Sequence, residues 1–157
     1  DEHYGKARCY TYNNTSGSHN LDEGFTAVIN DGLWHHIACS YRNGEMRVYT
    51  DGVLTTTDYG SPSLGATSRF VIGEPRSGIY DSYEAAPVYL GPIRISSTDR
   101  YNADFTPSTT WTVDGSTVAQ YLSNTEFDGN TLIDEAGADN NGSLRDDIIG
   151  GDTCPTE

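Results

Sequence analysis

The pair Asn43-Gly44, which lies between two alternating runs of residues, constrains the fold of this chain more than any other sequence feature. The run LWHHIACSY comes before this turn, and the run EMRVYT follows it. Both central positions of a type I′ hairpin turn need positive φ, a conformation that Asn and Gly adopt at low cost. The pattern therefore predicts an antiparallel hairpin here, and Asp51-Gly52 predicts a second turn directly after it.

Period-two alternation assigns the side chains of the first run to two opposite faces of a strand. One face takes Ile37, Cys39 and Tyr41, and the other takes Trp34, His36, Ala38 and Ser40. The neighbours His35 and His36 then point in opposite directions, so the two cannot both ligate one metal ion directly. We interpret both histidines as packing or hydrogen-bonding residues, and Trp34 as a core residue.

Further short strand signals follow at regular spacing, in residues 7–13, 24–30, 69–73, 88–96 and 117–122. The 157 residues include 17 Gly and 11 Tyr, with Leu, Ile and Val sparse among many Thr, Ser, Asn and Asp. Such a mixture favours short strands joined by many turns, because Gly, Asn and Asp tolerate turn dihedrals. Helix-forming runs longer than a turn or two are absent from the sequence. The predicted class is all-β.

Charge narrows the range of partners. Nine basic residues against 23 acidic residues give a formal net charge of −14, which repels phosphate backbones and excludes nucleic acid as a partner. The same charge suits a highly soluble protein and attracts cations such as calcium. No apolar run approaches the length of about 20 residues that spans a bilayer, so membrane insertion is not expected. The start at Asp1 indicates a processed or excised chain.

Several short motifs occur in a fixed order. They are LWHHIACSYRNGEMRVYTDGVL, then FVIG, then VYLGPIRISSTDRYNADFTP. In this order they resemble the LamG-like jelly-roll family of bacteria and phages, over roughly residues 7–107. The resemblance implies a two-sheet antiparallel β-sandwich of the concanavalin-A-like type. By analogy only, it also implies carbohydrate binding or adhesion at an extracellular, cell or virion surface.

The chain departs from the family pattern in two places. Gly91-Pro92 stands where the family's closing strand usually carries Asp-Glu, so any ligand supplied by those acids is missing. The family's opening strands are absent upstream, whereas residues 117–144 look like such an opening. We therefore expect a sandwich body in residues 1–112 and a C-terminal segment in residues 113–157. That segment completes either this sandwich or a neighbouring one.

The sequence carries no recognisable active site, and we expect no enzyme activity. Glycosidases of this architecture place paired carboxylates at same-face positions of one strand, about 5 Å apart. The nearest candidate pair is Glu126 with Asp128, which lies in a turn-rich tail and lacks a further acid at Asn130 or Leu132. No Ser-His-Asp or Cys-His set is suggested, because the acids near the two histidines belong to turns.

Two segments hold candidate binding residues. The long loop of residues 74–87 offers planar and polar groups suited to sugar, namely Arg76, Tyr80, Asp81 and Tyr83. The tail offers oxygen ligands at close spacing that suit calcium, namely Asp134, Asp139, Asn140 and Asn141. Simple packing of the tyrosines and a solvated turn are the respective alternatives.

Three cysteines allow at most one bridge. Cys9 and Cys39 are expected on neighbouring strands, where a bridge needs Cα atoms within about 7 Å; otherwise Cys39 serves as a small buried hydrophobe. Two functions from different classes remain open. One is a glycan-binding or adhesion module, and the other is a structural unit that assembles with further copies or other chains by strand pairing.

Overall fold

The computed structural model describes residues 4–15, 18–59, 72, 89–122, 131–137 and 140–143. Within these residues the secondary structure consists of nine strands: β1 (Arg8–Thr15), β2 (Ser18–Phe25), β3 (Ile37–Arg42), β4 (Glu45–Thr50), β5 (Val53–Tyr59), β6 (Ile93–Ser96), β7 (Thr117–Tyr121), β8 (Thr131–Leu132) and β9 (Gly142–Ser143). All pairings between them are antiparallel. The described residues contain no helix that could cross a membrane. The predicted all-β class is confirmed.

The chain divides into two compact units. The first comprises Asp1–Ser68 with Asp99–Trp111, and the second comprises Arg69–Thr98 with Thr112–Glu157. The first unit therefore holds strands β1 to β5, and the second holds β6 to β9.

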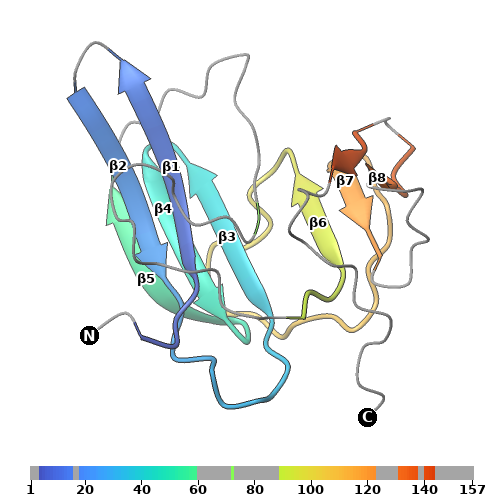
Figure 1. The fold of residues 1–157 in the computed structure, drawn as a ribbon, viewed down its shortest axis with the longest axis horizontal. Helices are drawn as coiled ribbons and strands as arrows, with labels where there is room; N and C mark the ends of the chain where they lie inside the picture. The colour runs from blue at the N-terminus through green and yellow to red at the C-terminus, as the bar shows by residue number, and fades with distance from the viewer. Residues whose placement is uncertain are drawn as a thin grey trace. The chain divides into compact units, whose positions relative to one another are not determined.

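Strands β3, β4 and β5 form a three-stranded sheet with β4 in the centre (Figure 1). Asn43 and Gly44 have φ of 52° and 82°, and Asp51 and Gly52 repeat these two values. Both turns are thus built from consecutive residues with positive φ, as the type I′ geometry requires. The two turn predictions are confirmed.

The central strand β4 supplies the main core of the first unit. Met46, Val48 and Tyr49 are almost completely buried. Alternation along the strand places Val48 and Tyr49 on opposite faces of the sheet. The Tyr49 ring contacts the rings of Tyr101 and Phe105, with centroids 6.1 and 5.5 Å away. The segment that follows Asp99 therefore covers this face of the sheet.

Gly52 allows the segment after Asp99 to approach the turn between β4 and β5 closely. Its carbonyl accepts a hydrogen bond from the Phe105 amide at 2.9 Å. A Cβ at this position would lie 1.9 Å from the Phe105 carbonyl oxygen, well inside any permitted contact. The turn residue is buried, so only glycine satisfies both the positive φ and the close approach.

Strands β1 and β2 form a hairpin that lies across the other face of the sheet, so the first unit is a two-sheet antiparallel sandwich (Figure 1). A Cβ on Gly24 would lie 2.5 Å from a Val48 methyl carbon, which shows how closely β2 approaches β4. Side chains of β5 also accept hydrogen bonds from backbone amides along the outer edge of β2. The Glu23 amide donates to Asp58 at 2.9 Å, and the Phe25 amide donates to Thr56 at 3.3 Å. These bonds protect an edge that would otherwise be open to another strand.

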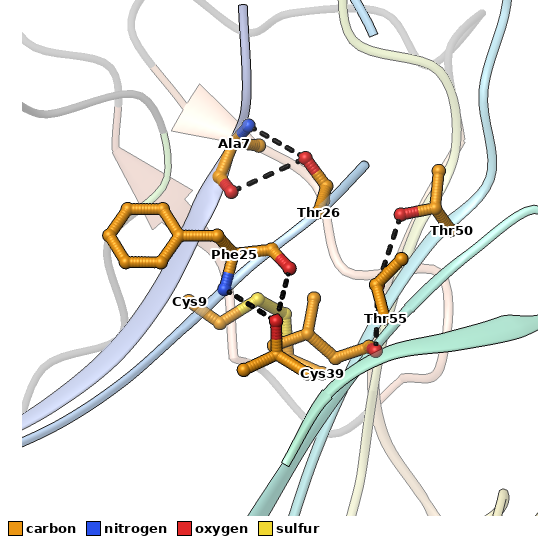
Figure 2. The surroundings of a disulfide bond; sticks show 9 residues. Ala7, Cys9, Phe25, Thr26, Cys39, Thr50 and Thr55 are labelled. Atoms are coloured by element: carbon orange, nitrogen blue, oxygen red, sulfur yellow. Dashed lines mark hydrogen bonds between the residues drawn. A yellow bond between two sulfur atoms is a disulfide. The ribbon is translucent and has the colours of Figure 1, made fainter. Parts of the chain in front are cut away.

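A disulfide joins the two sheets of this sandwich. Cys9 in β1 is bridged to Cys39 in β3, with Cα atoms 6.3 Å apart (Figure 2). The predicted bridge is therefore present. The expectation of neighbouring strands needs a correction, because β1 and β3 belong to different sheets and face each other instead of pairing.

The second unit contains two smaller antiparallel pairs. Strand β7 pairs with β6, and β8 pairs with β9. The predicted strand at residues 117–122 thus exists, and it pairs with a strand of its own chain. The division expected at residue 112 stays a prediction.

Three strand predictions had wrong bounds, and strands β5, β8 and β9 were not predicted. Strand β2 runs from Ser18 to Phe25, whereas the prediction covered residues 24–30 and shares only two residues with it. Strand β3 begins only at Ile37, and β6 begins only at Ile93, after Pro92. Proline has no amide hydrogen to donate to a ladder, which explains the late start of β6. Strand β5 was not predicted, because its Thr-rich sequence lacks apolar alternation. The strand predicted at residues 69–73 lies outside the described residues except for Ile72.

Candidate functional site

The side chain of His35 lies between two carboxylates of the first unit. Its Nδ1 is 2.8 Å from Asp51 Oδ2, and its Nε2 is 2.9 Å from Asp31 Oδ1. Asp51 also accepts the His36 amide at 2.8 Å, and Asp31 accepts the Leu33 amide at 2.9 Å. The imidazole thereby ties the loop before β3 to the turn between β4 and β5.

This geometry favours the charged form of the imidazole. Both ring nitrogens can donate to carboxylates only when both carry a proton. The hydrogen bond to Asp51, followed by the one to Asp31, raises the pKa of His35. The hydrogen bond from His35 is also the main cause that lowers the pKa of Asp31 and of Asp51. The three side chains form an ion-paired group in which no nucleophile takes part.

His36 points to the other side and belongs to an aromatic group. Its ring makes edge-on contacts with the rings of Tyr101, Phe105 and Trp111, at centroid distances of 6.3, 5.5 and 6.0 Å. The two adjacent histidines thus point apart, as alternation predicted, and each has the packing or hydrogen-bonding surroundings that were expected. The prediction for Trp34 was wrong: this residue is 49% exposed and does not belong to the core.

The four residues predicted to bind sugar lie outside the described residues. They are Arg76, Tyr80, Asp81 and Tyr83. The same is true of Glu126 and Asp128, the nearest candidates for a carboxylate pair. Their predicted behaviour stays a prediction.

The predicted calcium ligands in the tail lie partly within the described residues. The Asp134 side chain is buried, and its Oδ1 accepts the amides of Gln120 and Ala136 at 2.9 and 2.8 Å. Its Oδ2 accepts the Asn140 amide at 3.3 Å, and Asn141 Oδ1 accepts the Asp134 amide at 2.9 Å. These bonds organise the turn by themselves. Asp139 lies outside the described residues, so calcium binding stays a prediction.

No metal-binding group of three or more His, Cys, Asp or Glu side chains is found in the described part of the chain. Calcium can also take amide and carbonyl oxygens, so this finding bears mainly on transition metals such as zinc.

A mixed aromatic and charged group lies on the outward face of the β1–β2 hairpin. Cys9 and Gly24 face the second sheet, so their strand neighbours Arg8, Tyr10 and Glu23 face away from it. The Arg8 guanidinium carbon lies 4.9 Å from the centroid of the Tyr10 ring. The same guanidinium is 3.2 Å from a Glu23 carboxylate oxygen. We call Arg8, Tyr10 and Glu23 the Tyr10 platform. Sequence analysis did not single it out, although the alternation of ARCYTYN already placed Arg8 and Tyr10 on one face.

The fold and the motifs agree with a family comparison. A family model described as the concanavalin A-like lectin/glucanases superfamily matches residues 2–97, which is more than half of the chain. The chain therefore belongs to the concanavalin A-like lectin/glucanase superfamily. No curated protein and no solved structure matches it. The resemblance inferred from the motifs is confirmed at this level, and the bacterial or phage type stays a prediction.

Proposed function

We propose that this chain is a non-catalytic module that binds carbohydrate, or mediates adhesion, outside the cell. The observation that carries the proposal is membership of a superfamily whose description joins lectins with glucanases. Lectins hold sugars without changing them, whereas glucanases hydrolyse them. The question is therefore which of these two behaviours the described residues support.

The carboxylates at His35 do not have the properties of a glycosidase general acid. A glycosidase of this architecture needs one carboxylic acid whose pKa is raised, so that it remains protonated and can donate to the leaving oxygen. Asp31 and Asp51 both have a lowered pKa, because each accepts a hydrogen bond from His35. Neither can serve as that acid near neutral pH.

The disulfide supports an extracellular location. Bridges such as Cys9–Cys39 form and persist in oxidising compartments and are rare where glutathione keeps thiols reduced. The large negative charge agrees with a soluble surface exposed to solvent.

A glycan array tests the proposal directly. The intact chain is applied to immobilised oligosaccharides with and without a chelator, and reducing-end release is measured on the sugars that bind. We expect binding to at least one class of glycan and no release of reducing ends. Loss of binding in the chelator arm would assign calcium to the site. Absence of binding to every glycan, or turnover abolished by Glu126→Gln, would refute the proposal.

The alternative function is a structural unit that assembles with other chains. Exposed apolar side chains favour it, since four of them lie in the short stretch between β2 and the start of β3: Val28, Leu33, Trp34 and Ile37. Light scattering across a concentration series tests this candidate. A mass that remains that of one chain at all concentrations would reject it.

A further inference from the structure

The Tyr10 platform has the chemical composition that recognises a sugar ring. A pyranose offers an apolar face of C–H groups and a rim of hydroxyls. An aromatic ring takes up the apolar face, while a carboxylate accepts and a guanidinium donates hydrogen bonds to hydroxyls. Tyr10, Glu23 and Arg8 supply one group of each kind, and the Arg8 guanidinium lies against both the Tyr10 ring and the Glu23 carboxylate.

The platform is accessible and its groups are held in place. Tyr10 is 37% exposed, and the side chains of Arg8 and Glu23 are 32% and 35% exposed. The guanidinium is fixed between the Tyr10 ring and the Glu23 carboxylate, so these side chains lose less rotamer freedom when a ligand arrives. The Cys9–Cys39 bridge anchors the strand that carries Arg8 and Tyr10.

Charge selects the class of sugar. The positive Arg8 and the negative Glu23 compensate each other locally, so the platform has no excess positive charge for a carboxylated or sulfated sugar. The formal net charge of −14 repels polyanionic glycans from the whole chain. The platform therefore suits uncharged sugars.

We infer that the Tyr10 platform is the surface on which this chain holds neutral glycans, with the Tyr10 ring stacked on the sugar and with Arg8 and Glu23 bonded to its hydroxyls. The inference rests on the proposed function and gives it a location and a ligand class. It differs from a purely structural interpretation, in which the ion pair and the ring contact only stabilise the hairpin.

The test is calorimetric titration of the intact chain with neutral oligosaccharides, namely cellohexaose, xylohexaose and mannohexaose, together with a sulfated oligosaccharide. The unmodified chain should bind at least one neutral sugar and not the sulfated one. Tyr10→Ala should weaken that binding by at least about tenfold, because the stacking surface is lost. Tyr10→Phe keeps the ring and should stay within about threefold of the unmodified chain.

Tyr59→Ala is the matched control, because Tyr59 is an exposed tyrosine on β5, a strand of the other sheet. It should leave the affinity unchanged. Near-ultraviolet circular dichroism confirms that each variant is folded; if Tyr10→Ala is not, Tyr10→Leu replaces it as an apolar side chain without a ring.

The outcomes separate the inference from the proposed function. Neutral-sugar binding that is equally strong in the unmodified chain, Tyr10→Ala and Tyr10→Leu overturns the inference and leaves the proposed function standing. Binding of the sulfated sugar alone also overturns the inference. If the intact chain binds no sugar at all, both fall.

Discussion

Removal of the Cys9–Cys39 bridge should destabilise the first unit by an amount that follows from the length of the loop it closes. The two cysteines are separated by 30 residues in the sequence. The loop-closure model assigns such a cross-link an entropy that corresponds to about 3.6 kcal/mol at 25 °C. For a unit of this size, each kcal/mol shifts the melting temperature by about 4–8 °C. The first unit of the double variant Cys9→Ser/Cys39→Ser should therefore melt about 14–29 °C lower.

The assay is urea unfolding followed by selectively excited tryptophan fluorescence. The chain has two tryptophans, Trp34 and Trp111, and both belong to the first unit, so this signal reports the unit that holds the bridge. The urea dependence of the free energy should also rise, since an unfolded chain without the cross-link exposes more surface. Cys154→Ser is the control, because it removes a thiol without touching this bridge.

Two results would refute the reasoning. One is a decrease of less than about 1 kcal/mol in the free energy of unfolding of the double variant, with no change in the slope of that free energy against urea concentration. The other is an equal loss for Cys154→Ser, which would mean that the bridge does not set the stability of this unit.

The remaining predictions concern a turn, a titrating group and a buried carboxylate. Gly52→Ala should lower the free energy of unfolding by at least about 2 kcal/mol more than Gly32→Ala does. Both glycines have φ near +80°, but only Gly52 would place its Cβ against the Phe105 carbonyl. Equal losses of unfolding free energy in chemical denaturation would contradict this. The raised pKa of His35 means that its stabilising contribution is complete below about pH 6.5 and is lost as pH rises through the raised value. The melting temperature should fall over that range, and His35→Gln should abolish the slope; a slope that persists in the variant would sink the assignment. Asp134→Ala should cost about 3 kcal/mol, because three backbone amides lose their acceptor; thermal unfolding of the second unit measures it, and a loss within the error of the assay would show that those bonds contribute little.

Local chemistry was sufficient to predict part of the fold. Asn43-Gly44 and Asp51-Gly52 specified both turns, because positive φ at consecutive residues depends mainly on the residues themselves. The opposite directions of His35 and His36 also followed from the extended backbone alone. Strand β5 was missed because its sequence lacks apolar alternation, and its strand structure depends on pairing with β4.

The sequence also could not predict which residues at the strand ends are exposed. Trp34 precedes the start of β3 and is half exposed, although its size and its place in the motif indicated the core. Exposure depends on whether another segment of the folded chain covers the residue, and the local sequence does not specify this.

The sequence by itself thus determined the class, the turns and the direction of alternation in its strongest hairpin, all of which depend on residues close together in the chain. Only the tertiary structure decided that Cys9 meets Cys39 across two sheets, that Asp58 satisfies the edge of β2, and that Arg8, Tyr10 and Glu23 form one surface. The physical reason is distance along the chain. Contacts between the two sheets, such as those between residues 30 to 35 positions apart, exist only after the sheets have packed, since the approach of β2 to β4 at Gly24 fixes which side chains meet.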